Sequence, residues 1–280
     1  MTGPATASLE GQVALVTGAD RGLGRRIALE LASSGMAVAL AALSVDELDE
    51  VAAEVEAAGG QALVVPGDVT DRVSVQSFVA RVEGGLGPVD LLVNGAGGHD
   101  APGEFLSTEP DDWWSAVEAG LRGTALCSYY VMKRMVPRRR GRIVNLVGDP
   151  ALGPSPIGSE AACSDAATLR LTDSLALAAW PQGISVFALS PGRIGGPADQ
   201  EPDEDEAAQI EDRLLAASGL VISLASGRAD RLTGRFIHVQ DDLEELVSRA
   251  DEVEIGDLLQ LRLQRLQPAP ADDEAATVQS

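Results

Sequence analysis

Short apolar runs alternate with amphipathic stretches along most of this chain, and this alternation limits the fold more than any other feature. Helical patterns follow the first five runs, including long ones over 110–136 and 158–179. Uninterrupted apolar strands that alternate with helices are typical of a parallel sheet covered on both faces. The sequence therefore predicts an α/β protein with a doubly wound parallel sheet of about seven strands. The runs occupy residues 12–17, 36–41, 61–66, 89–94, 142–147, 184–189 and 235–239.

We expect a single domain over residues 11–266, because the alternation continues through nearly all of this range. Residues 1–10 are expected to form a flexible N-terminus and residues 267–280 a disordered tail. Residues 195–212 are acidic and contain several Gly and Pro, which predicts a solvated loop or, alternatively, a lid over a cleft. Residues 241–266 alternate acidic and apolar side chains, which predicts a helical extension beyond the last strand.

Acidic side chains dominate the composition: 43 Asp and Glu stand against 21 Lys and Arg, a formal net charge of −22. This excess argues against nucleic-acid partners and against anionic membrane surfaces. No apolar stretch reaches the roughly 18 residues that a membrane span needs, and the N-terminus lacks a secretion signal. Two cysteines cannot form a disulfide framework. We therefore expect a cytoplasmic protein without a metal site.

A glycine-rich loop over residues 17–24 directly follows the first apolar run and opens the first helix. Glycines permit a tight turn there and let backbone N–H groups approach a pyrophosphate, which the positive end of the helix dipole also attracts. The strand before the loop and the helix after it make a phosphate-binding loop the favoured interpretation. The residues expected to contact the cofactor here are Gly18, Asp20, Arg21, Gly22, Leu23 and Gly24.

The G-x-x-x-G-x-G spacing of this loop and three later motifs resemble the short-chain dehydrogenase/reductase family. The later motifs are Gly-Asp-Val at 67–69, Asn-Gly-Ala-Gly at 94–97 and Ser-Pro-Gly at 190–192. The resemblance covers about residues 10–240 and implies a seven-stranded Rossmann sheet that binds NAD or NADP. The further cofactor contacts that it implies are Asp68 and Val69 beside the adenine, and Asn94, Ala96 and Gly97 along the cofactor cleft.

Two departures from the family pattern concern the cofactor. Gly95 stands where the family has a second Asn. After the second strand, where NAD-preferring members carry an acid and NADP-preferring members an Arg, residues 41–44 read Ala-Ala-Leu-Ser. Arg21 could contact the 2′-phosphate of NADP, but an arginine that is simply exposed to solvent is an equally good interpretation. The choice between NAD and NADP therefore stays open.

The family's hydride transfer uses a Tyr that donates a proton, a Lys four residues later, a Ser that polarises the carbonyl and an Asn on the preceding long helix. The positions that match them here are Gly148 for the Ser, Ala161 for the Tyr, Asp165 for the Lys and Gly120 for the Asn. Small apolar side chains cannot transfer or hold a proton. The resemblance therefore predicts a divergent member without conventional dehydrogenase chemistry, whose nucleotide site is either functional or vestigial.

One other Tyr-x-x-x-Lys pair, Tyr129 and Lys133, has the family's spacing but a different place in the chain. It precedes the strand at 142–147, whereas the family's pair follows that strand. Lys133 is also the only lysine in the sequence. We interpret the pair as part of the long helix rather than as a catalytic pair.

Acid/base groups remain near the predicted cleft, and they favour a non-redox enzyme acting on a small organic substrate. Candidate catalytic residues are His99 on the loop after the 94–97 segment, Asp149 after Gly148, and Glu160 and Asp165 around Ala161. Such groups could catalyse proton abstraction, dehydration, isomerisation or cyclisation. The competing interpretation is an exposed histidine and solvated carboxylates in an acid-rich chain.

Two alternatives stay open. The chain could be a catalytically inactive subunit that supports an active partner of the same family, or an oxidoreductase in which His99 or Glu160 replaces the Tyr. Members of the family form dimers and tetramers through their long helices, so the resemblance implies a homo-oligomer or a hetero-oligomer with another member.

Overall fold

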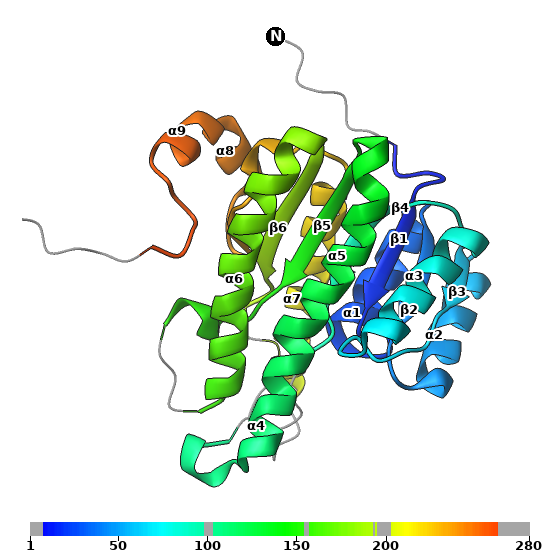
Figure 1. Cartoon of the computed structure of the whole chain (residues 1–280), viewed down its shortest axis with the longest axis horizontal. Coiled ribbons are helices and arrows are strands. Elements are labelled where there is room, and N and C mark those ends of the chain that lie inside the picture. The colour runs from blue at the N-terminus through cyan, green and yellow to red at the C-terminus, as the bar shows by residue number, and fades with distance from the viewer. Residues whose placement is uncertain (1–7, 98–102, 154–156, 193, 195–202, 263–280) are drawn as a thin grey trace, which may run out of the picture.

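One parallel sheet of seven strands forms the centre of the computed structural model, which describes residues 8–97, 103–153, 157–192, 194 and 203–262 (Figure 1). The strand order is β3-β2-β1-β4-β5-β6-β7, so the predicted doubly wound parallel sheet in a single domain is confirmed. The strands are β1 (Val13–Thr17), β2 (Ala37–Ala41), β3 (Gln61–Val64), β4 (Val89–Asn94), β5 (Gly141–Leu146), β6 (Ile184–Ser190) and β7 (Phe236–His238).

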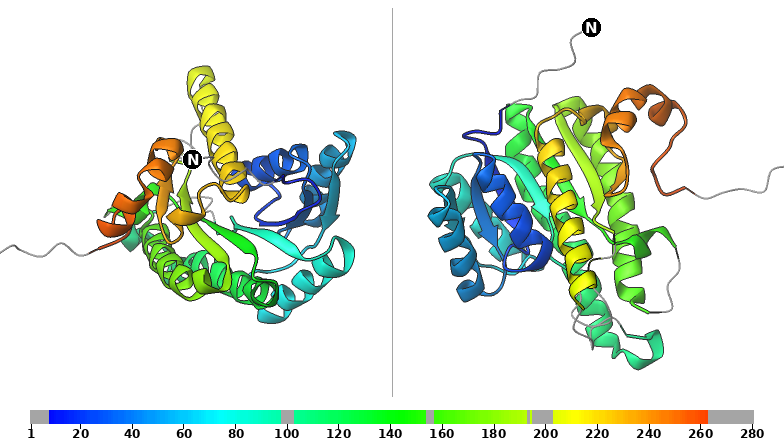
Figure 2. Two further views of the ribbon diagram at one scale, coloured as in Figure 1. Left: turned by 90° about the horizontal axis from the view of Figure 1, so that it is seen from above. Right: turned by 180° about the vertical axis from the view of Figure 1, so that it is seen from behind.

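Helices cover both faces of the sheet, as the uninterrupted apolar runs require (Figure 2). On β1, Ala14 and Val16 belong to one core cluster, and Val13 and Leu15 belong to the other. This alternation follows from the two-residue period of a strand. One face carries α1 (Gly22–Ser33), α2 (Val45–Ala57) and α7 (Glu204–Ala225), and the other carries α3 (Arg72–Gly85), α5 (Gly123–Met135) and α6 (Ser159–Ala179).

The registers of the central strands bring their carboxyl ends to a common edge. Thr17 at the end of β1 pairs with Asn94 at the end of β4, and Asn94 pairs with Asn145 near the end of β5. Loops that follow parallel strands at one edge are the usual place for ligands in a doubly wound sheet. The segments that carry the predicted site residues therefore lie along one edge of the sheet.

The long helix predicted over 110–136 is interrupted. The segment consists of α4 (Pro110–Val117), a π-helical turn (Glu118–Arg122) and α5. Within the π-turn lies Gly120, where an added Cβ atom would lie only 2.2 Å from the Ser164 hydroxyl of α6. A π-turn inserts an extra residue into a helix and often marks a functional site.

The predicted acidic loop over 195–212 is shorter than expected, because residues from Glu204 onward belong to α7. The side chain of Asp203 accepts the backbone N–H of Glu206 at 2.8 Å and so caps the helix. Residues 195–202, including the rest of that loop, lie outside the described residues. The interpretation as a solvated loop was therefore wrong for 204–212, where capping and alanines favour a helix.

The N-terminal end of the domain departs from the prediction, whereas the C-terminal extension contains helices. Leu9 is buried against the core, so the flexible N-terminus does not extend over all of residues 1–10. The predicted extension over 241–266 contains two short helices, α8 (Leu243–Ser248) and α9 (Ala250–Ile255). Beyond them Arg262 pairs with Asp173 of α6 at 2.9 Å. The predicted tail over 267–280 lies outside the described residues, as do residues 1–7.

Short 3-10 helices connect several elements, at Phe105–Ser107, Val136–Arg138, Asp149–Leu152, Trp180–Gln182 and Asp230–Leu232. Across the described ranges, no helix combines the length and apolar character that crossing a membrane requires. Nor do the described residues gather three or more His, Cys, Asp or Glu side chains in a group suited to a metal ion. Both cysteines are free, Cys127 buried and Cys163 exposed.

Candidate functional site

The glycine loop between β1 and α1 is closely packed at Gly18 and Gly24, where side chains would not fit. An added Cβ atom at Gly24 would lie 1.9 Å from the Gly18 carbonyl oxygen, and one at Gly18 would lie 2.7 Å from the Gly95 carbonyl oxygen. Gly18 and Gly22 also have positive φ angles of 68° and 52°, which glycine adopts without strain. The loop thus brings the start of α1 close to the end of β4.

No side chain caps the beginning of α1 within the described residues, and its N-cap residue is the exposed Arg21. The first N–H groups of a helix have no partners inside the helix, and they attract anions when no side chain caps them. The amides of the first turn, starting at Gly22, therefore form a suitable cradle for a phosphate group. Asp20 is half-buried beside them, and Leu23 packs against the core.

The loop after β4 is fixed to β1 by one hydroxyl group. Thr17 Oγ1 accepts the backbone N–H groups of Gly95 at 3.1 Å and Ala96 at 3.3 Å. A Cβ atom at Gly95 would lie 2.8 Å from the Thr17 carbonyl oxygen. A side chain at this position would therefore be crowded against the end of β1. Gly97 has a φ of 124° and packs against Gly120 of the π-turn, where its own Cβ atom would lie 2.7 Å from the Gly120 Cα.

Asn94 belongs to a buried polar network rather than to an open surface. Its amide nitrogen donates to Asn145 Oδ1 at 2.8 Å and to Ser128 Oγ at 3.2 Å. Asn145 in turn donates to Thr172 Oγ1 at 2.9 Å. The side chain therefore ties β4 to β5, α5 and α6, and only its backbone reaches the cofactor edge.

The segment predicted to lie by the adenine follows β3. The exposed Asp68 accepts the backbone N–H and the hydroxyl of Thr70 on Oδ1, at 2.7 and 2.8 Å, which orients its carboxylate. Val69 is buried against Gly123 at the start of α5. After β2, Ser44 caps α2 by accepting the Glu47 N–H at 3.4 Å. Leu43 is exposed there, and this turn still does not distinguish NAD from NADP.

Two positions that match the family's catalytic Ser and Lys are brought together at the end of β5. The backbone N–H of Gly148 donates to Asp165 Oδ2 at 2.8 Å. Burial raises the pKa of Asp165 to about 6, although the bond from Gly148 acts in the opposite direction. A carboxyl group with this pKa changes its charge close to neutral pH, so it can both accept and donate a proton. Ala161, at the Tyr position, lies one turn earlier on α6.

Buried polar atoms without partners line the same face of α6. The described residues offer no hydrogen-bond partner to Glu160 Oε2 or to Ser164 Oγ, although both side chains are buried. They are four residues apart and so lie on one face of the helix. Ser164 occupies the space beside Gly120, at the position that matches the family's Asn.

Asp149 lies farther along the edge, in a cluster that the sequence analysis did not predict. Its Oδ1 accepts the hydroxyl of Ser190 at 2.6 Å and lies 3.3 Å from His238 Nε2. Asp149 and His238 also line a pocket of about 370 Å³ together with Gly192, Val239, Gln240 and the α7 residues Asp212, Arg213 and Ala216. The sequence contains one signal for this cluster. Ser190 and His238 stand at the carboxyl ends of β6 and β7, where ligands usually bind in a doubly wound sheet.

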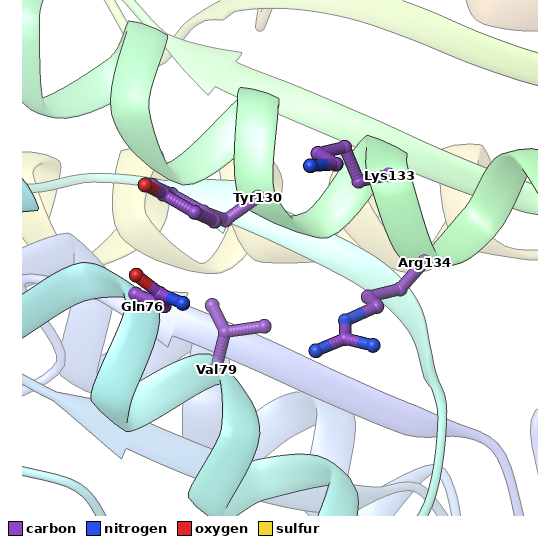
Figure 3. A pocket seen from close by; sticks show the side chains of 5 residues that line it. All are labelled: Gln76, Val79, Tyr130, Lys133 and Arg134. Carbon is purple, nitrogen blue, oxygen red and sulfur yellow. The ribbon is translucent and has the colours of Figure 1, made fainter.

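His99 lies outside the described residues, so its place relative to the cleft is not described. Tyr129 and Lys133 lie on α5, as predicted, and the Lys133 ammonium is 5.4 Å from the centre of the exposed Tyr129 ring. Figure 3 shows Lys133 and Tyr130 with residues of α3 around a smaller pocket of about 190 Å³. This pocket lies between α3 and α5 and shares no residue with the edge described above.

Comparisons with known proteins agree with this geometry. Residues 12–207 match the sequence profile of the family described as short chain dehydrogenase. A protein named short chain dehydrogenase from Pseudocercospora fijiensis is 32% identical over 265 residues, which are 87% of this chain and 85% of the relative. Short chain dehydrogenase pigC of Monascus ruber is 30% identical over 271 residues, 92% of this chain and 88% of the relative. The solved structure of a dehydrogenase/reductase from Sinorhizobium meliloti is similar with a TM-score of 0.72 at 28% identity, covering 82% of this chain and 95% of that one.

Proposed function

Because this chain belongs to the short chain dehydrogenase family, we propose that it binds NAD or NADP but catalyses proton transfer rather than hydride transfer. The substrate is a small organic molecule. The observation that carries the proposal is the bond from the Gly148 amide to Asp165. It places a carboxylate, held against the backbone, where the family's pattern has a lysine beside a serine.

The nucleotide half of the cleft supports cofactor binding. Glycines 18 and 24 leave no space for side chains, and the amides at the start of α1 have no capping side chain among the described residues. A pyrophosphate fits such a loop because the N–H groups and the helix dipole both favour an anion. Asp68, oriented by Thr70, would accept a hydrogen bond from the adenine amino group. When bound, the cofactor would supply a nicotinamide ring to the other half of the cleft.

The reaction half of the cleft is unsuited to hydride chemistry of the conventional kind. Gly148 and Ala161 present no hydroxyl group to polarise a carbonyl or to protonate an alkoxide. Asp165 replaces an ammonium group by a carboxylate, which reverses the charge that would stabilise a phenolate. With Gly120 at the Asn position, the side chain that would hold a relay water is also missing.

Proton transfer is the chemistry that the remaining groups can perform. Asp165 has a pKa raised to about 6 by burial, which suits a general acid or base near neutral pH. Glu160 is buried nearby on the same helix, and Asp149 lies at the neighbouring pocket. His99 stays a candidate on sequence grounds alone. Isomerisation, dehydration and cyclisation each need such groups and no net oxidation.

Two measurements on the purified protein test this proposal. Fluorescence titration with NADH and NADPH is expected to show saturable binding of at least one of them. Absorbance at the nicotinamide band is expected to stay constant when a panel of ketones, aldehydes and alcohols is added with the reduced or oxidised cofactor. Sustained cofactor turnover with any of these compounds would contradict the proposal, and so would failure of both cofactors to bind at millimolar concentration.

We further propose that the chain self-associates through the outer faces of α5 and α6. Tyr129, Leu177 and Trp180 expose 56%, 81% and 48% of their surface there, and such apolar groups gain from being covered. Light scattering after gel filtration is expected to give a dimer or tetramer. Recovery of the chain only in a complex with a second family member would instead support the role of an inactive supporting subunit.

A further inference from the structure

We propose that Asp149 is the proton-accepting carboxylate of a substrate pocket between β6, β7 and α7, and that His238 and Ser190 position it. This inference rests on the proposed function, since it names where proton transfer takes place and on what class of compound. The pocket is the one of about 370 Å³ lined by Asp149, Gly192 and His238. Its volume suits a small organic molecule.

The first step concerns the imidazole of His238, which cannot act as a free base itself. The backbone N–H of Gln240 donates to His238 Nδ1 at 3.2 Å. A nitrogen that accepts a hydrogen bond carries no proton, so in the neutral ring the proton lies on Nε2. Nε2 is the atom that lies 3.3 Å from Asp149 Oδ1. The histidine therefore directs an N–H group toward the carboxylate.

The second step concerns the hydroxyl of Ser190, whose orientation is equally fixed. Ser190 Oγ accepts the backbone N–H of Gly192 at 3.1 Å and donates to Asp149 Oδ1 at 2.6 Å. Both side-chain contacts of the carboxylate thus involve Oδ1. Within the described residues Oδ2 has no hydrogen-bond partner, so it is the oxygen left for a ligand in the pocket.

The third step separates Asp149 from the other candidate acids. Asp165 is largely buried, and Glu160 is only 4% exposed. Asp149 keeps 46% of its side chain accessible while being held from two sides. It therefore combines an ordered carboxylate with access to a ligand, which a catalytic base needs.

The pocket also contains groups that recognise an oxygen atom. Gln240 lines it and its side-chain amide carries N–H donors, so the pocket can bind a carbonyl oxygen. We infer that the substrate is a small ketone with a hydrogen on the carbon next to the carbonyl. Asp149 Oδ2 takes that proton, the C–H electron pair forms the C=C bond of an enolate, and the carbonyl π pair moves to oxygen. Return of the proton to the same carbon exchanges its hydrogen, and delivery of the proton to oxygen gives the enol isomer; neither outcome needs an oxidant.

Hydroxyacetone in deuterated water is the probe that tests this assignment. The protein is expected to accelerate replacement of the hydrogens next to the carbonyl by deuterium, followed by proton NMR. Asp149→Asn is expected to lower the enzyme-catalysed rate by about 100-fold, the usual contribution of a general base. Asp49→Asn on the exposed face of α2 is the control, because it removes a carboxylate outside the pocket and should leave the rate unchanged. Absence of acceleration by the wild-type chain, or equal rates for wild type and Asp149→Asn, would overturn the assignment.

The positioning role of His238 has its own readout. His238→Gln keeps an N–H donor near Asp149 and is expected to retain more exchange activity than His238→Leu. Nitrogen-15 NMR of the imidazoles, assigned with His99→Gln, is expected to show the Nε2–H tautomer of His238 at pH 8. An Nδ1–H tautomer, or equal activity of the two variants, contradicts the positioning role. Oxidation of NADPH by hydroxyacetone would instead contradict the proposed function, so the two failures are distinguishable.

Discussion

The two halves of the cleft differ in how their glycines are used. In the half that we propose binds the nucleotide, close backbone approach requires glycine at Gly18 and Gly24. In the reaction half, Gly148 leaves a functional position without a side chain, and Gly120 makes room for Ser164. The shape of the glycine loop and the side chains of the reaction half are therefore constrained by different contacts.

The largest effect is expected on nucleotide affinity, from a substitution in the glycine loop. Gly24→Ala places a Cβ atom 1.9 Å from the Gly18 carbonyl oxygen, so the loop must open. We expect nucleotide affinity to fall by at least about 100-fold, or roughly 2.8 kcal/mol, in a fluorescence titration with NADPH. Gly219→Ala on α7 is the matched control, because nothing lies within 4 Å of the added atom there. Unchanged affinity of Gly24→Ala would show that the loop does not bind the nucleotide.

A smaller effect is expected when the Asn of the family is restored. Gly120→Asn brings a Cβ atom within 2.2 Å of Ser164 Oγ and should lower the free energy of unfolding by roughly 1–3 kcal/mol through overpacking. Adding Ser164→Gly removes the obstructing hydroxyl and should recover much of the loss. Urea unfolding of both single variants and the double variant measures the coupling. Additive effects would mean that the two positions do not compete for the same space.

The third prediction concerns pH. Since the pKa of Asp165 is raised to about 6 in the folded chain, the folded state binds its proton more tightly than the unfolded state does. The ionised carboxylate therefore lowers stability as pH rises from about 4 through 6, and the loss is complete above about 7. Asp165→Asn removes this loss and keeps an acceptor for the Gly148 N–H.

We expect the free energy of unfolding of Asp165→Asn to exceed that of wild type by roughly 1–2 kcal/mol at pH 8. The raised pKa of Asp165 sets an upper limit of about 3 kcal/mol, and solvent screening makes the expected value smaller. At pH 5, midway through the range from about 4 to 6, the difference should be about half as large. Urea midpoints at the two pH values measure it. Asp149→Asn serves as the comparison variant, since Asp149 is more exposed. A difference of the same size at pH 5 and pH 8 would contradict the titration of Asp165.

The smallest effect is expected outside the cleft. Lys133→Met removes the ammonium group beside the exposed Tyr129 ring, an interaction worth roughly 0.5–1 kcal/mol at the surface. Nucleotide binding and hydroxyacetone exchange should both remain at the wild-type level. A loss of either activity would indicate that Tyr129 and Lys133 belong to the active site. It would contradict their interpretation as part of the long helix alone.

The sequence predicted the sheet and the glycine loop between β1 and α1 well because both depend on local pattern, and nucleotide binding by that loop stays a prediction. Apolar runs determine which segments are buried strands, and the strand–glycine–helix order determines where a phosphate can bind. The helix that begins at Glu204 was not predicted, because a run of acidic residues is also typical of a solvated loop. The signal for the helix is Asp203, which caps it. The π-turn at Gly120 was missed because a helical pattern alone does not reveal an inserted residue.

The sequence by itself therefore determined the fold, the position of the glycine loop and the residues at the four family positions. Tertiary structure decided which side chains meet. Asp165 approaches Gly148 across 17 residues, and Asp149 meets Ser190 and His238 across 41 and 89 residues. Such encounters depend on strand order and register in the sheet, which bring together residues from distant parts of the chain and which no local pattern encodes.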